Sequence, residues 1–173
     1  LSVYVDDNVM TGQIRVEIRE ELDRIFNHHP GRIIEPKHLP SGDLLWDVLG
    51  SDVYYNREDR RLLINMSRYI DKLVKKYNLE GHRSIITPNF DESVFKCVSE
   101  KAVKFPYREL IGALQWVVTV ARPDAAFSVS VLARYSSGPI SEALVKAAKK
   151  VLMYLSTTKD IGLFYSPQSE MAF

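Results

Sequence analysis

Three observations on the 173-residue chain predict an α+β fold. Short β-like runs, such as Leu1–Val5, lie mostly in the N-terminal part and favour strands. Apolar residues repeat at helical spacing from Ser67 to Leu79. The last third is helical in pattern and is broken by prolines. The composition, 46% hydrophobic and 26% charged, is that of a globular protein.

The N-terminal segment predicts a strand hairpin followed by a helix. Leu1–Val5 and Val9–Thr11 have strand character, and they flank Asp6–Asn8, residue types that favour tight turns. Apolar residues at i, i+4 spacing then predict an amphipathic helix over residues 14–25. The chain opens directly in strand sequence, and an isolated hairpin is marginally stable. We therefore expect further sequence upstream.

The next segment predicts strands separated by a loop. Arg32–Glu35 favours a short strand and Pro36–Gly42 a loop. Leu44–Tyr55 is predicted to be one longer strand, interrupted by Gly50 and paired with Arg61–Asn65. A glycine inside a strand often marks a bulge or a close backbone approach.

The helix predicted over Ser67–Leu79 has two contrasting faces. Ser67 is a candidate N-cap, and Gly81 lies just beyond the end. The apolar stripe consists of Tyr69, Ile70, Leu73, Val74 and Tyr77. The opposite face carries Arg68, Lys72, Lys75 and Lys76. Such a face suits the spaced phosphates of a nucleic acid, and it is equally compatible with solvated lysines. Lys146, Lys149 and Lys150 invite the same interpretation.

The remainder of the chain predicts a linker, three helices and a strand. Thr87–Phe105 is polar and without pattern, so we interpret it as a linker. Glu109–Ala121 is a predicted helix, and Pro123 suits the first turn of a second one. Ser141 is a candidate N-cap of a third helix, and Ile161–Ser166 favours a final strand.

Charge and composition exclude several classes of protein. The net charge of +1 indicates no global attraction to polyanions, so any nucleic-acid contact must come from local patches. Apolar runs fall well short of the roughly 20 residues needed to span a bilayer, so no membrane partner is expected. Cys97 is the single cysteine, which excludes an internal disulfide and fits a reducing compartment. The histidines show no zinc-ligand spacing.

Several motifs resemble reverse transcriptases. Tyr4–Asp7 is similar to the tetrapeptide of the palm hairpin, and Leu49–Gly50 resembles the start of the strand that handles the primer terminus. Tyr69–Leu79 is similar to the thumb helix, and Thr87–Pro88 matches a pair found in copia-type elements. The most specific matches are Tyr107–Leu114, Ala121–Asp124, Ala147–Leu155 and Lys159–Leu163. Their order is that of copia-type LTR retrotransposons.

Two places depart from the family pattern. Leu144–Val145 stands where the family commonly has His-Trp, and the spacing over residues 28–44 differs. The resemblance implies RNA-directed DNA polymerisation during retrotransposition. The alternative is a non-catalytic nucleic-acid-binding or structural relic of such an element, which the upstream coding sequence would distinguish.

The resemblance also implies a catalytic metal site. Asp6 corresponds to a metal ligand and Asp7 lies beside it, so both are candidate catalytic residues for Mg²⁺ or Mn²⁺. Two Mg²⁺ ions can activate a primer 3′-oxygen and stabilise the leaving oxygen, and carboxylates suit this hard ion. In the family a third carboxylate comes from an upstream strand, so the fragment is expected to be inactive alone. Taken without context, the Asp pair is also typical of a polar turn.

Further residues are expected near the primer and the template, with dNTPs as the other substrate. The resemblance places Tyr4 and Val5 by the primer end, and Trp46, Leu49 and Gly50 in a primer-grip strand. The alternatives are that Val5 simply packs on its strand and that Gly50 marks an ordinary bulge beside a core Trp46.

The resemblance divides the chain into four parts. These are a palm fragment (1–56), a thumb-like hairpin and helix (57–86), a linker (87–106) and a helical connection (107–173) leading toward an RNase H domain beyond Phe173. The partners would include the upstream fingers and palm and the downstream RNase H of the same polyprotein. The expected location is cytoplasmic, in virus-like particles, with nuclear entry.

Overall fold

The structure, a computed structural model, describes residues 2–4, 7–9, 17, 20–21, 24, 35–91 and 102–167. The chain forms two compact units, which we name the N-terminal unit (Leu1–Pro36) and the C-terminal unit (Lys37–Phe173).

A hairpin forms the start of the N-terminal unit. β1 (Ser2–Tyr4) pairs antiparallel with β2 (Asp7–Val9), and Tyr4 lies opposite Asp7. The predicted hairpin is therefore confirmed, but its second strand begins at Asp7 rather than at Val9. Val5 and Asp6 lie outside the described residues. Most of the helix predicted over 14–25 also lies outside them, although its described members Glu17, Glu20, Glu21 and Arg24 are helical and exposed.

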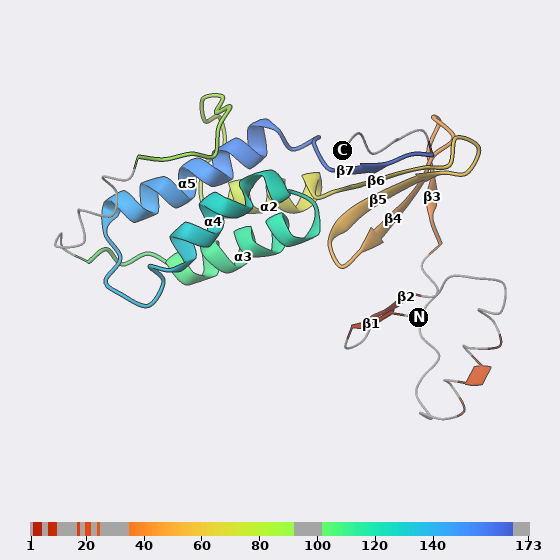
Figure 1. Ribbon diagram of the computed structural model, residues 1–173, viewed down its shortest axis with the longest axis horizontal. Coiled ribbons are helices and arrows are strands. Elements are labelled where there is room, and N and C mark those ends of the chain that lie inside the picture. Colours follow the sequence, from red (N-terminus) through yellow and green to blue (C-terminus); the bar gives the residue numbers. More distant parts are fainter. Residues whose placement is uncertain are drawn as a thin grey trace. The chain divides into compact units, whose positions relative to one another are not determined.

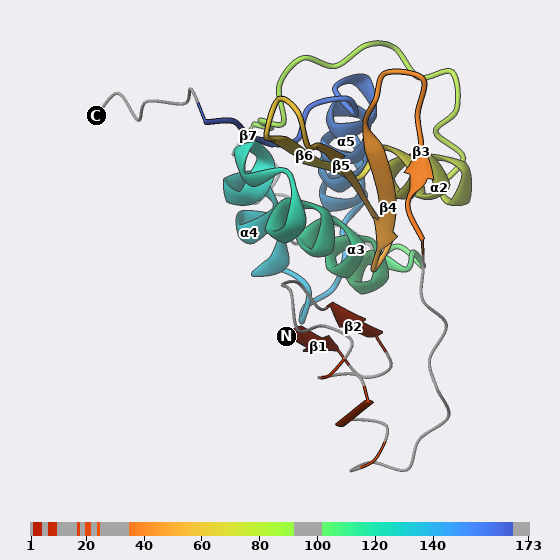
Figure 2. The same ribbon diagram turned by 90° about the vertical axis from the view of Figure 1, so that its right-hand side faces the viewer.

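The C-terminal unit contains one antiparallel sheet in the order β3-β4-β5-β6-β7, and Figure 2 shows the strands side by side in this order. The strands are β3 (Lys37–His38), β4 (Leu44–Val48), β5 (Ser51–Asn56), β6 (Arg61–Asn65) and β7 (Leu163–Tyr165). The sheet joins segments far apart in the sequence, because β7 pairs with β6. The palm, thumb and connection assignment stays a prediction.

Two strand predictions and one loop prediction need correction or remain open. Leu44–Tyr55 is not one strand but the hairpin β4–β5, in which Val48 pairs with Ser51 around Leu49 and Gly50. Leu49 and Gly50 have φ of 52° and 81°, and positive φ at both central residues is what a two-residue hairpin turn of type I′ requires.

The short strand β3 was also missed. Lys37–His38 lies inside the predicted loop Pro36–Gly42, and it pairs with β4. The predicted strand Arg32–Glu35 lies outside the described residues except for Glu35, which belongs to neither a helix nor a strand.

The helices confirm the predicted pattern, although α2 ends at Lys76 rather than at Leu79. They are α2 (Ser67–Lys76), α3 (Tyr107–Val120), the short 3₁₀ helix η2 (Pro123–Ala125), α4 (Ala126–Ala133) and α5 (Glu142–Thr157). Ser141 caps α5, because its Oγ accepts a hydrogen bond from the Leu144 amide at 3.3 Å. The predicted Ser67 cap is wrong: Met66 occupies the N-cap, and the Ser67 hydroxyl instead donates to the Lys159 carbonyl at 2.9 Å.

The core lies among these helices, which Figure 1 shows grouped at one end of the sheet. Fully buried side chains come from every helix, including Ile70 of α2, Leu114 of α3, Leu132 of α4 and Leu152 of α5. The packing of α2 against α5 fixes which face of α2 meets solvent. Among the described residues, no helix is long and apolar enough to cross a membrane.

Candidate nucleic-acid interface

α2 has a buried apolar face and an exposed basic face. Ile70, Leu73, Val74 and Tyr77 are each at most 7% exposed, and Tyr69 is half-buried against the core, which confirms the predicted stripe. Such burial gives a short helix most of its stability, since isolated helices of this length are marginal in water. The four basic residues therefore point away from the core, and the structure gives them different surroundings.

Arg68 is engaged within the protein. Its guanidinium donates to Asp52, a β5 residue that is 1% exposed, and it lies 3.2 Å from an Asp47 carboxylate oxygen. The pKa of Arg68 is raised, chiefly by the hydrogen bond to Asp52. Removing Arg68 would leave a buried carboxylate without its cation, which is costly. Arg68 therefore ties α2 to the β4–β5 hairpin.

Lys76 is also paired. Its ammonium donates to Glu109 in the first turn of α3, and this hydrogen bond raises the pKa of Lys76. Its Nζ lies 5.9 Å from the centre of the Tyr77 ring. Both partners of the Lys76–Glu109 pair are about half exposed, so the pair is screened by water.

Lys72 and Lys75 differ from these two residues. Both are exposed, and within the described parts of the chain neither has an ion-pair partner. They lie three residues apart, so they are neighbours on the helix surface. Of the four predicted phosphate ligands, these two have their charge available to an external anion.

The predicted primer-grip residues lie on the β4–β5 hairpin. Trp46 is half-buried in β4, opposite Val53. Leu49 and Gly50 form the turn, which is closed by a 3.2 Å hydrogen bond from the Gly50 amide to Asp47. The position of a Gly50 Cβ would be 3.8 Å from the Tyr69 ring, so the turn lies against α2. The alternative of a bulge within one strand is wrong, while the primer-grip role stays a prediction.

The candidate metal ligands are on the other unit. Asp7 begins β2 opposite Tyr4, and Asp6 and Val5 lie outside the described residues. The carboxylate oxygens of an adjacent aspartate pair are the donors that Mg²⁺ prefers, so the donor chemistry fits the expected ion. Among the described residues, no group of three or more candidate ligands gathers elsewhere.

A buried cluster around Arg122 was not predicted as a site. The Arg122 side chain is 0% exposed. Its guanidinium donates two hydrogen bonds to the Asp124 carboxylate, at 2.9 and 2.8 Å. It also donates to the carbonyl of Thr158 at 2.8 Å and to the hydroxyl of Thr158 at 2.7 Å. Tyr154 donates to Asp124 at 2.6 Å. Burial raises the pKa of Asp124, but the hydrogen bonds from Arg122 and Tyr154 outweigh it and hold that pKa below its usual value. The cluster joins two of the motifs that carry the family resemblance.

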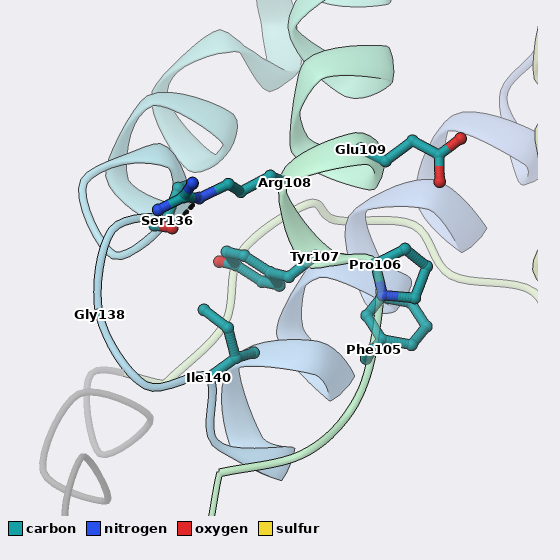
Figure 3. Close-up of a pocket in the computed structure, with 8 residues that line it drawn as sticks. All are labelled: Phe105, Pro106, Tyr107, Arg108, Glu109, Ser136, Gly138 and Ile140. Carbon is teal, nitrogen blue, oxygen red and sulfur yellow. Dashed lines mark hydrogen bonds between the residues drawn. The ribbon is translucent and has the colours of Figure 1, made fainter.

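A shallow pocket of about 380 Å³ lies at the start of α3. In Figure 3, Arg108 and Glu109 leave the helix on different sides of this pocket. Arg108 donates to the Ser136 carbonyl at 2.7 Å, and Tyr107 donates to the Leu132 carbonyl at 3.0 Å. Burial raises the pKa of Tyr107. These contacts bind α3 to the end of α4, so the pocket's polar groups already serve the fold.

Two of the three lysines of α5 have partners of their own, whereas Lys150 is half-buried and, among the described residues, has no ion pair. Lys146 lies 2.7 Å from Glu142, one turn earlier. The Lys149 Nζ lies 5.3 Å from the centre of the Phe105 ring. Lys146 and Lys149, like Lys76, are therefore engaged by groups of the protein itself, whereas Lys72 is not. For this reason α2 remains the stronger candidate interface.

The chain is similar to Pol polyproteins of transposons along nearly its whole length. A retrovirus-related Pol polyprotein from transposon TNT 1-94 of Nicotiana tabacum is 27% identical over 95% of the chain. The corresponding protein from transposon RE2 of Arabidopsis thaliana is 28% identical over 94%. The putative transposon Ty5-1 protein of Saccharomyces cerevisiae is 25% identical over 99%.

These relatives are longer than the chain, which spans 12%, 10% and 53% of their respective lengths. The homologues of this chain are retrotransposon Pol polyproteins. No family model matches it, and neither does a solved structure.

Proposed function

We propose that the chain is part of the RNA-directed DNA polymerase of a retrotransposon, and that α2 contacts the primer–template backbone. The observation that carries the proposal is the pair Lys72 and Lys75, exposed opposite the buried stripe of α2 and, among the described residues, without an internal anion. The similarity to Pol polyproteins supports it. In this proposal the palm corresponds to residues 1–56, the thumb to 57–86 and the connection to 107–173.

The chemistry of the α2 face sets what it can recognise. Lysine side chains are flexible point charges that meet phosphate oxygens without reading base edges. Binding through them is independent of sequence and releases counterions, so it weakens as salt rises. A polymerase that must move along any template needs this kind of contact.

The N-terminal hairpin supplies the proposed catalytic groups. Asp6 and Asp7 would hold Mg²⁺, which when bound activates the primer 3′-oxygen and stabilises the leaving oxygen. Tyr4 and Val5 adjoin these carboxylates in sequence, and we assign them to the primer end. Trp46 and the Leu49–Gly50 turn are the proposed primer grip, held against α2 by the Arg68–Asp52 ion pair.

Binding of a DNA duplex at several salt concentrations tests the α2 assignment. The wild-type chain should bind independently of sequence. Changing Lys72 and Lys75 to Ala removes two contacts, so the slope of log affinity against log salt should become shallower by about 1.8. The matched control changes Arg57 and Arg60, two exposed cations in the β5–β6 turn, and should leave the slope as it was. Equal slopes for the Lys72/Lys75 variant and the wild type would exclude this face.

A further inference from the structure

Asp71 is the only acidic residue of α2, and its side chain is 46% exposed. It precedes Lys75 by four residues, with the acidic residue on the N-terminal side. This is the spacing and order at which an acidic and a basic side chain pair well on a helix. Such a pair would neutralise one of the two lysines that the proposed interface needs.

Asp71 instead binds a lysine from another part of the chain. The Lys159 Nζ donates to both Asp71 carboxylate oxygens, at 3.0 and 2.9 Å. Lys159 follows α5 at the corner that leads to β7. The pair is formed by residues 88 positions apart, so it depends on the tertiary fold rather than on the helix alone.

The position of Lys159 is fixed on two sides. Its own carbonyl accepts the hydrogen bond from the Ser67 hydroxyl, in the first turn of α2. The preceding residue, Thr158, receives two hydrogen bonds from the buried Arg122. The corner is thereby fastened to α2 and to the end of α3, and the Lys159 side chain starts from a defined place beside Asp71.

We propose that Lys159 is a positioning residue that keeps the basic face of α2 open to nucleic acid by holding Asp71 away from Lys75. The inference rests on the proposed function. When Lys159 is removed, Asp71 turns to Lys75, and one phosphate contact is lost although no phosphate-binding lysine has been changed.

The test measures binding of a DNA duplex to the full 173-residue chain by fluorescence anisotropy over a range of salt concentrations. Lys159→Ala should make the salt slope shallower by about 0.9, the value of one phosphate contact. Lys159→Arg, which keeps a cation beside Asp71, should retain the wild-type slope. The control Lys37→Ala lowers the net charge equally at an exposed position in β3 and should also retain it.

Two combinations separate this role from a structural or general charge effect. Asp71→Asn added to Lys159→Ala should restore the wild-type slope, because the competing carboxylate is gone. In a Lys75→Ala background, Lys159→Ala should have no further effect. Any one of three results would overturn the inference. The first is a wild-type slope in Lys159→Ala, and the second is a shallow slope that Asp71→Asn does not restore. The third is that Lys159→Ala makes the slope shallower even in the Lys75→Ala background.

The result is distinguishable from failure of the proposed function. If the Lys72/Lys75 double variant keeps the wild-type slope, the interface itself is wrong. If that variant has a shallower slope while Lys159→Ala does not, only the role of Lys159 is wrong. Asp71→Asn alone keeps every basic residue and should bind at least as tightly as the wild type, and weaker binding would also count against the inference.

Discussion

Replacing Arg122 by Ala should destabilise the protein strongly, although Arg122 lies outside the proposed interface. The side chain is 0% exposed and makes four hydrogen bonds, two to Asp124 and two to Thr158. Loss of one partner from a buried ion pair costs about 3–5 kcal/mol. The Asp124 side chain is 38% exposed, so water can solvate its carboxylate in the variant. We therefore expect a loss of about 3 kcal/mol in the free energy of unfolding, at the lower end of that range.

The assay is urea or thermal unfolding followed by circular dichroism. For a chain of this size, a loss of about 3 kcal/mol corresponds to a fall in Tm of roughly 6–12 °C. Arg134→Ala is the matched control, because Arg134 is an exposed arginine at the end of α4 and its removal should cost within about 0.5 kcal/mol. Arg122→Lys should fall between the two, since lysine keeps the charge but lacks the planar fork. A loss below about 1 kcal/mol for Arg122→Ala would refute the reasoning.

Three further outcomes follow from particular residues. Gly162→Ala should destabilise the protein by about 1–3 kcal/mol, because the new Cβ would stand 2.2 Å from the Ile64 carbonyl oxygen. Gly112→Ala should instead stabilise it by about 0.5–1 kcal/mol, because a Cβ on Gly112 of α3 meets open space. Equal effects of the two changes in thermal unfolding would contradict this. The folded-state pKa of Asp124 lies below its unfolded value of about 3.9, so its stabilising contribution is present above about pH 4 and is lost as pH falls through the folded pKa. The difference in unfolding free energy between wild type and Asp124→Asn should therefore shrink from pH 6 to pH 3, and a constant difference would argue against this linkage. The chain should bind Mg²⁺ weakly in a calorimetric or NMR titration, and changing both Asp6 and Asp7 to Asn should abolish that binding. Tight Mg²⁺ binding that survives the double change would exclude the hairpin as the metal site.

Local patterns were sufficient for the helices and insufficient for one turn and one short strand of the sheet. The stripe from Ile70 to Tyr77 repeats at helical spacing, and its burial follows directly from that repeat. The β4–β5 turn was missed because Leu49 adopts a φ of 52°, which is uncommon for a leucine, so the sequence carries no ordinary turn signal there. β3 was missed because two residues between prolines give no periodicity.

The surroundings of the site residues could not be predicted because they depend on long-range contacts. Helical spacing placed Arg68 with the lysines, but its partner Asp52 lies on a different element, 16 residues earlier. The Arg122–Thr158 contact joins residues 36 positions apart, although each belongs to or adjoins a motif visible in the sequence. Arg122 stands next to Pro123 in an otherwise apolar stretch, and this position was the one sign in the sequence that the arginine is buried in an ion pair.

Primer extension on an RNA template tests the proposed polymerase function most directly. Residues 1–173 would replace the aligned segment in a related transposon Pol polyprotein, and the chimera would be compared with its Asp6→Asn variant and with an Arg57→Ala control. Catalytic groups must be held within about 1 Å of their working positions, so loss of a metal ligand should be severe. We expect Mg²⁺-dependent extension by the chimera and the control, and its disappearance in the Asp6→Asn variant. Extension by Asp6→Asn at the rate of the unchanged chimera would contradict the proposed active site.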